Sequence, residues 1–310
     1  MSPEDQWVLT RRGSKVLLDP LRAYAATWEE EPDPTGRLAP TAVVFITNNE
    51  CPFHCVMCDL WVHTLDTRVP IGAIPHQIRE ACATLPTARQ IKLYNAGSFF
   101  DPEAIPPEDD EEIARTVERF DRVIVESHPA FLTGAHGDRC LRFRDRLSGR
   151  LEVAVGLETA DPAALARLNK RMTLDSFARA ADFLVRHAID LRAFILLKPP
   201  FAGEDDYVES ACRSIDCARG HGASVCSVIP TRGGNGAMEA LDPPFVPPTL
   251  RALEQVMEYG LTTAGLSRVF ADLWDIARLF TCACSPARVE RLRKMNLAQQ
   301  IAMPVACSDC

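Results

Sequence analysis

A regular alternation of strand-like and helix-like segments after residue 42 most constrains the fold. Six short, largely apolar runs have the length and composition of buried β-strands, and an amphipathic stretch separates most of them from the next. Strands joined through helices pair in parallel through right-handed crossovers. The predicted strands are Ala42–Thr47, Gln90–Tyr94, Arg122–Glu126, Leu151–Gly156, Leu191–Leu197 and Ser224–Ile229, and the predicted helices lie near 75–85, 110–119, 137–147, 174–187 and 204–219. This pattern fits both an open doubly wound sheet and a partial barrel.

The segments that flank this alternation differ from it in character. Residues 1–39 are polar and end in the turn-rich run Glu31–Gly36, so we interpret them as an N-terminal extension. Residues 40–248 form the predicted core domain. Residues 249–310 begin with a predicted helix at 249–264 and continue into a tail that contains four cysteines, so we interpret them as a C-terminal extension.

Composition excludes several classes of protein. Hydrophobic residues make up 47% of the 310 residues and charged residues 25%, which are globular values. The net charge of −8 gives no global positive field towards nucleic acid or an anionic membrane. No window approaches the apolar length of a membrane span, and the N-terminus has no signal-peptide pattern. We therefore expect a soluble, cytoplasmic protein with no membrane partner; the sequence leaves its oligomeric state open.

Three cysteines directly after the first predicted strand are the strongest chemical signal. They stand in the run Cys51-Pro-Phe-His-Cys55-Val-Met-Cys58, and thiolates are soft ligands that suit iron–sulfur clusters and zinc. With 12 cysteines in 310 residues, chance would produce this spacing roughly 0.02 times per chain. Three cysteines can bind three irons of a cubane and leave the fourth iron open, so we predict a 4Fe–4S cluster. The alternative, zinc, would need a fourth ligand such as His54 or His63.

This C-x3-C-x2-C loop after the first strand of a (βα)6 chain resembles the radical SAM superfamily. The resemblance implies an α/β fold, a partial (βα)6 TIM-type barrel with a short C-terminal cysteine-containing extension. It also implies that S-adenosylmethionine chelates the open iron through its amino and carboxylate groups. One electron, from a donor such as flavodoxin or ferredoxin, would then cleave the cofactor to a 5′-deoxyadenosyl radical that abstracts hydrogen from a substrate.

Loops at the carboxyl ends of the strands build the site of such a barrel. After the second predicted strand, Asn95, Ala96, Gly97 and Ser98 occupy the place where a Gly-containing segment of radical SAM proteins meets the methionyl amine through backbone carbonyls. The segment departs from the common Gly-Gly-Glu form, which favours backbone contacts over a carboxylate. The alternative is an ordinary turn from strand to loop, which Asn and Gly would also serve.

Two charged residues end other predicted strands. Glu158 ends the fourth, where radical SAM proteins place a polar side chain against the ribose or methionyl part of the cofactor, and an unpaired acid there would be costly. The alternative role for Glu158 is at a helix start, but Asp161 followed by Pro162 is the better N-cap. Lys198 follows the fifth predicted strand, either as an active-site cation or as a cap of the strand end before Pro199.

A narrower resemblance rests on three runs, Gly156–Thr159, Leu168–Thr173 and Phe194–Phe201. They resemble the Elongator-catalytic-subunit-like branch and, within it, the radical SAM component of archaeosine synthase. This implies a nucleoside or tRNA base as substrate, which would have to be flipped or single-stranded to reach a buried radical site. The acidic net charge instead favours a small molecule or peptide of specialised metabolism. A third hypothesis is a non-catalytic zinc-binding interaction protein.

The tail carries two close pairs of thiols, Cys282-x-Cys284 and Cys307-x2-Cys310. Tetrahedral zinc with four thiolate ligands needs such an arrangement, and so does a second iron–sulfur cluster. A turn at Ser285-Pro286 and a helix at Arg288–Met295 would let the chain fold back and bring the pairs together. We therefore predict a second metal site in the tail, with either zinc or an auxiliary cluster.

Overall fold

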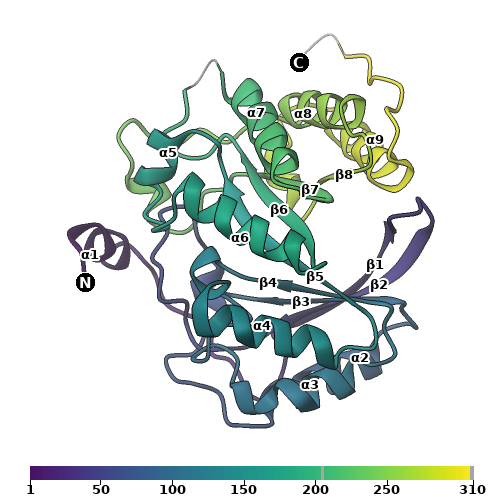
Figure 1. Cartoon of the computed structure of the whole chain (residues 1–310). Helices are drawn as coiled ribbons and strands as arrows, with labels where there is room; N and C mark the ends of the chain where they lie inside the picture. The colour runs from purple at the N-terminus through teal and green to yellow at the C-terminus, as the bar shows by residue number, and fades with distance from the viewer. Residues whose placement is uncertain (204–205, 308–310) are drawn as a thin grey trace.

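A curved sheet of eight strands forms the framework of the protein in the computed structural model, which describes residues 1–203 and 206–307 (Figure 1). The strands stand in sequence order, β2 to β8 pair in parallel, and β1 pairs antiparallel with β2. Their bounds are β1 Ala25–Pro32, β2 Leu38–Ile46, β3 Gln90–Asn95, β4 Arg122–Glu126, β5 Arg150–Glu158, β6 Asp190–Leu197, β7 Val225–Pro230 and β8 Arg268–Ala271. Parallel neighbours in sequence order are the topology of a barrel rather than of a doubly wound sheet.

Helices cover the outer face of this sheet, and local signals fix where several of them begin (Figure 1). Asp161 caps α5, and Thr173 forms a capping box with Ser176 at the start of α6. The helices are α1 Pro3–Leu9, α2 Ala73–Thr84, α3 Asp110–Thr116, α4 Gly134–Arg146, α5 Pro162–Arg167, α6 Leu174–Arg186, α7 Tyr207–Gly220, α8 Leu250–Thr262 and α9 Ser285–Ala298. Short 3-10 turns are η1 Leu60–His63, η2 Pro107–Asp109, η3 Pro129–Phe131, η4 Met238–Ala240 and η5 Ile276–Leu279.

The strand alternation gives the sheet two faces of opposite character. Side chains such as Val44, Leu93 and Val153 point outwards and join the hydrophobic core beneath the helices. The intervening positions point inwards and are often polar or charged, for example Lys92 and Arg192. Because successive side chains of a strand alternate in direction, one residue of register decides whether a group belongs to the core or to the barrel interior.

The six predicted strands correspond to β2 to β7, and the predicted partial barrel is confirmed. The sheet is wider than predicted, because β1 and β8 come from the segments interpreted as N- and C-terminal extensions. The acidic composition of β1, which contains Glu29, Glu30 and Glu31, is unfavourable for a strand by propensity, and β8 has only four residues. The proposed boundary residues of the three segments stay a prediction.

Helix α9 covers the gap that a partial barrel leaves between its edge strands. It contacts both β1 and β8. The side-chain amide of Asn296 bonds both backbone groups of Ala271, at 2.8 and 2.9 Å, and that of Gln299 does the same for Val269, at 2.9 Å each. These bonds satisfy the free edge of β8, which would otherwise be open to pairing with another chain.

Within residues 1–203 and 206–307, every helix is too short or too polar to cross a lipid bilayer.

Candidate active site at the carboxyl ends of the strands

The barrel interior contains a cavity of about 1130 Å³. Residues from all eight strands line it, together with the loops that follow β2, β3, β4 and β7. Loops at the carboxyl ends of parallel barrel strands are where enzymes of this architecture place their chemistry. The cavity therefore defines the candidate site.

The three-cysteine loop after β2 lies on this cavity. Cys51, Cys55 and Cys58 all line it, and none of them is in a disulfide. Burial raises the pKa of Cys51 to about 12 and that of Cys58 to about 11, and it raises the pKa of Cys55 well above its ordinary value. Three buried thiols of this kind would stay protonated unless a cation among them compensated the negative charge, which is what a bound metal centre does.

Two asparagines hold the cysteine loop in shape. Asn235 donates from Nδ2 to the carbonyls of Val56, at 2.7 Å, and of Cys58, at 3.1 Å. Asn169 donates from Nδ2 to the carbonyl of His54 at 2.8 Å. The loop conformation is thus fixed by distant parts of the chain, which pre-organises the three thiols.

The N-terminal helix α1 is fastened to the same loop through Asp5. One carboxylate oxygen of Asp5 accepts from Asn169 at 3.0 Å and lies 3.3 Å from Nδ1 of His54, and the other accepts from Arg171 at 2.5 Å. The backbone N–H of Ser2, together with these partners, holds the pKa of Asp5 well below its usual range. The polar start of the chain, interpreted from sequence as an extension, therefore supports the site.

The spacing of the loop thiols suits a cluster better than a single ion. Among the described residues, the three thiols of the tail are the only group of three metal-binding side chains whose ligand atoms lie within 4.8 Å of one another. The sulfurs of Cys51, Cys55 and Cys58 are therefore farther apart than that. Thiolates on one zinc ion, at about 2.3 Å each, would stand under about 4 Å apart. The predicted alternative zinc ligands are engaged elsewhere, since His54 contacts Asp5 and His63 stacks on Tyr24 at 4.8 Å.

Glu158 points into the cavity from the end of β5 and pairs with Lys170. It has a φ of 64° at a bulge in the β5–β6 pairing, an uncommon backbone conformation for a residue with a side chain. Lys170 donates to the Glu158 carboxylate and, at 2.8 Å, to the carbonyl of Gly156. Burial alone would lower the pKa of Lys170, but the carboxylate holds it above its ordinary value. The predicted helix cap is confirmed at Asp161, which accepts from Ala163 N at 2.8 Å.

The segment after β3 reaches the cavity through Ala96, Gly97 and Ser98, but not through Asn95. Asn95 continues the outward-facing series of Ile91 and Leu93 and is buried, with both amide atoms lacking a hydrogen-bond partner in the described chain. Strand parity explains this difference from the predicted group of four. Gly97 has a φ of 152°, and a Cβ at this position would lie 3.5 Å from Cβ of Cys51, so the segment passes directly beside the cysteine loop.

Lys198 does not line the cavity. A φ of 59° turns the chain out of β6 at this residue, and the ammonium group lies 5.1 Å from the ring centroid of Tyr207 in α7. Of the two predicted roles, this placement favours the end of the strand over the cavity; binding of a cofactor by Lys198 stays a prediction.

Two titratable residues that the sequence reasoning did not single out also face the cavity. Burial raises the pKa of Glu126, at the end of β4, to about 8, and the nearby Glu158 adds to the shift. Burial lowers the pKa of His128 to about 3; this neutral ring donates from Nε2 to the carbonyl of Lys170 at 3.0 Å and stacks on Phe53 at 4.0 Å. The signal that identified Glu158, an acid at the end of an apolar strand, would have identified Glu126 as well.

The amino end of the barrel is closed by an ion-pair network. Arg192 donates to Glu31 at 2.5 Å and to Glu152 at 2.6 Å, Lys92 donates to Glu31 at 2.5 Å, and Arg122 donates to Glu152 at 2.9 Å. Burial alone would raise the pKa of Glu31, but Arg192 and Lys92 hold it well below its usual range. The floor of the cavity is therefore charged but paired.

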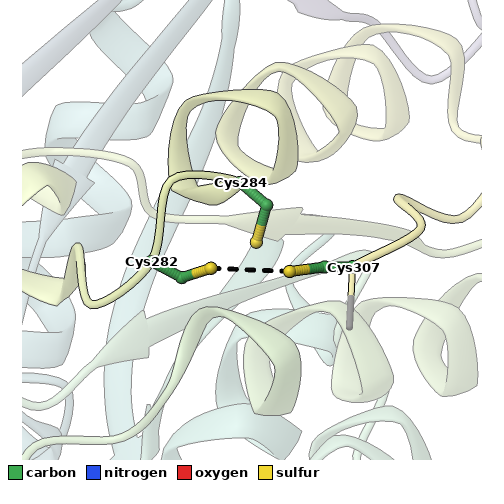
Figure 2. Close-up of side chains that lie close together, drawn as sticks. All are labelled: Cys282, Cys284 and Cys307. Carbon is green, nitrogen blue, oxygen red and sulfur yellow. Dashed lines mark hydrogen bonds between the residues drawn. The ribbon is translucent and has the colours of Figure 1, made fainter. Parts of the chain in front are cut away.

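The tail thiols form a second group, away from the cavity lining. Cys282, Cys284 and Cys307 lie within 4.8 Å of one another by their sulfur atoms, as the fold-back of the tail predicted (Figure 2). Cys310, the predicted fourth member, lies outside the described residues.

Comparison with solved structures gives the class of fold. The chain superposes on methylornithine synthase with a TM-score of 0.55 and 16% identity, covering 87% of this chain and 69% of that one. It superposes on the archaeal Elp3 of Methanocaldococcus infernus with a TM-score of 0.55 and 13% identity, covering 82% and 63%. The protein has the partial-barrel fold of radical SAM enzymes.

The sequence comparison points more narrowly. The chain is 26% identical over 219 residues to archaeosine synthase subunit beta of Methanosarcina acetivorans, which covers 67% of this chain and 62% of that protein. The resemblance predicted from the motifs is thereby confirmed. The chain spans about three fifths of the length of the curated relatives it matches. No family model matches it.

Proposed function

We propose that this protein is a radical SAM enzyme with a 4Fe–4S cluster on Cys51, Cys55 and Cys58. The observation that carries the proposal is the convergence of three widely spaced thiols from one pre-organised loop on the cavity of a partial barrel. Such a cluster, when bound, supplies an open iron for S-adenosylmethionine and the electron that cleaves it to a 5′-deoxyadenosyl radical.

The residues of the chain then bind and orient the cofactor. The backbone at Ala96, Gly97 and Ser98 lies beside the cysteine loop and is the proposed contact for the methionyl amine. Glu158 is the proposed acceptor for the ribose or methionyl part, and Lys170 positions its carboxylate. A Cβ at Gly156 would overlap the ends of both the Glu158 and the Lys170 side chains, so a larger residue there would displace this pair.

We propose a nucleoside or tRNA base as substrate. The support is the similarity to proteins named archaeosine synthase subunit beta and an interior wide enough for a base, with aromatic walls at Tyr24, Phe45 and Trp274. Aromatic rings of this kind stack on extruded bases. A small molecule or peptide is the second candidate, favoured by the net charge of −8, which works against binding of a polyanion.

One anaerobic experiment tests both levels of the proposal. The reconstituted protein is incubated with S-adenosylmethionine and dithionite, and 5′-deoxyadenosine is quantified by chromatography. We expect cofactor cleavage, and more of it when unmodified tRNA is supplied. We also expect nucleosides of altered mass in a digest of that tRNA after the reaction. Cleavage that responds only to a metabolite extract would favour the second candidate. Absence of iron, of the cluster absorbance and of cofactor cleavage would overturn the assignment as a radical SAM enzyme.

A further inference from the structure

A second thiol cluster, formed by Cys282, Cys284 and Cys307, is unexplained by the proposed function. Cys282 follows η5, Cys284 is the N-cap of α9, and Cys307 lies in the tail beyond α9 (Figure 2). The chain thus returns after 25 residues to place a third thiol against the first two. The sulfurs of Cys282 and Cys307 are 3.5 Å apart, far beyond the length of about 2.05 Å of a disulfide bond.

The geometry of this cluster fits one tetrahedral ion. Its three sulfurs lie within 4.8 Å of one another, whereas those of the barrel loop are spread more widely. Thiolates bound to one zinc ion at about 2.3 Å stand about 3.8 Å apart, and a cubane needs its thiolates farther apart because each binds a different iron. The same comparison that favours a cluster in the barrel therefore favours a single ion in the tail.

Neighbouring groups support thiolates at this place. Arg288 donates from Nε to Sγ of Cys284 at 3.3 Å, and its charge is balanced by an ion pair with Glu254 of α8. The turn is fixed by two bonds between Cys282 and Ser285, one in each direction, at 3.0 and 3.3 Å. Cys284 is the N-cap of α9, so its thiolate lies at the positive end of the helix.

The tail itself has few other means of attachment. Ile301 and Met303 are exposed, and the carbonyl of Ala302 accepts from Arg291 at 2.8 Å. A segment with so little buried apolar surface gains most from a metal crosslink.

We propose that Cys282, Cys284 and Cys307 bind one zinc ion as thiolates, and that this ion fastens residues 299–307 to the start of α9. The fourth position of the ion is left to a ligand outside this triad. Trp274, Asp275 and Arg278 line the cavity and lie shortly before Cys282 in the chain. Arg293 and Asn296 of α9 line the cavity as well. The zinc ion therefore also anchors the part of the barrel wall that closes the gap between β1 and β8.

The test uses the full chain with Cys51, Cys55 and Cys58 changed to Ala, which removes the proposed iron site. This protein is stripped with a chelator, reloaded with Zn²⁺ and desalted. We expect about one zinc per chain and an X-ray absorption spectrum with sulfur ligands at about 2.3 Å. Zinc absent after reloading, or bound without sulfur ligands, would overturn the proposal. So would an iron–sulfur centre in the same background before stripping.

A matched pair of double variants locates the site. Cys282→Ser with Cys284→Ser, in the same background, should reduce bound zinc at least tenfold. Cys212→Ser with Cys217→Ser, two half-buried thiols of α7, should leave it unchanged. Equal zinc content in the two double variants would refute the assignment.

A third measurement avoids any variant at the tail. Thiol alkylation mapped by mass spectrometry should modify Cys282 and Cys307 at least tenfold more slowly in the zinc-loaded protein than in the chelated protein, while hydrogen exchange in 299–307 accelerates on chelation. Equal alkylation in both states would contradict the proposal. None of these readouts depends on cofactor cleavage, so the tail site and the radical SAM activity can fail independently.

Discussion

The two ends of the barrel use polar side chains in opposite ways. At the amino end, Arg192, Lys92 and their carboxylate partners are buried and paired within the protein. At the carboxyl end, three thiols and the half-buried Glu126 face a cavity. Burial raises the pKa of each of these groups, which favours its neutral form. The charged groups at the amino end are paired with each other, whereas the titratable groups at the carboxyl end are left for a bound cofactor to pair.

This difference shows that one end of the sheet contributes mainly to stability and the other mainly to function. Charges already paired inside the protein have little left to offer a ligand, and breaking such a pair leaves a buried charge without compensation. Groups held neutral in a cavity can ionise when a cofactor brings the opposite charge. Substitutions at the two ends should therefore produce opposite patterns of lost stability and lost function.

The largest expected effect is at the carboxyl end. Changing Cys51, Cys55 and Cys58 to Ala should abolish 5′-deoxyadenosine formation, because no other described residues supply the three-thiolate site of the barrel, while the unfolding midpoint of the cluster-free protein should change little. Cleavage is measured by chromatography after anaerobic reconstitution. Cys82→Ala, a half-buried thiol on α2, serves as the control and should retain activity. Reductive cleavage that persists in the triple variant would show that these thiols do not hold the cluster, and would contradict the role given to the carboxyl end.

The next effect belongs to the amino end. Arg192→Met should lower the free energy of unfolding by about 3–5 kcal/mol, because Glu31 and Glu152 would lose a buried partner. Denaturant unfolding measures the change. Arg186→Met, which removes an exposed pair with Asp182, should cost under about 1 kcal/mol. Unchanged stability of Arg192→Met together with lost cofactor binding would reverse the assignment of the two ends.

A smaller effect separates site from scaffold within one loop. Glu158→Gln should weaken S-adenosylmethionine binding about 10- to 150-fold, the loss of a charge-assisted hydrogen bond of about 1.5–3 kcal/mol. Asp161→Ala, three residues away, should cost about 1 kcal/mol of stability as a lost helix cap and leave affinity unchanged. Equilibrium binding and thermal unfolding of both variants give the answer. The same stability loss in both, with full affinity, would make Glu158 a purely structural residue.

The smallest expected effect is a pH dependence at Glu126. Burial raises its folded-state pKa from 4.5 to about 8, so the folded protein holds a proton that the unfolded chain has lost, and stability falls as pH rises from about 4.5 to 8. One pKa unit corresponds to about 1.4 kcal/mol, and because Glu126 faces a cavity we expect Glu126→Gln to gain about 1 kcal/mol at pH 8. Unfolding of the cluster-free protein at pH 6 and pH 8.5 measures the gain.

The matching control is Glu108→Gln, which also removes one negative charge but at an exposed acid paired with Arg68. A gain for Glu126→Gln that is the same at both pH values would contradict the buried, neutral carboxyl.

Local patterns in the sequence determined the frame of the fold and the chemistry of its first loop. The apolar runs that became β2 to β7, the cap at Asp161 and the spacing of Cys51, Cys55 and Cys58 all depend on residues close together in the chain. Such features follow from strand and helix periodicity and from ligand spacing, which need no knowledge of distant contacts. The motif at Leu168–Thr173 was also recognised from sequence, but the ion pair between its Lys170 and Glu158 was not predicted.

Only the tertiary structure decided which side chains face the cavity and what they meet there. The alternation of side chains along β3 places Ala96 inside the barrel and Asn95 outside it. The positive φ of Lys198 turns the chain out of β6, and its ammonium group lies beside Tyr207 of α7. By sequence, the acids of residues 25–32 belong to an exposed extension. In the fold, Arg192, 161 positions away in the chain, pairs with Glu31 and buries it in the floor of the barrel. These outcomes depend on pairings between residues far apart in the chain, where the gain from compensating a buried charge outweighs the local preference against an acidic strand.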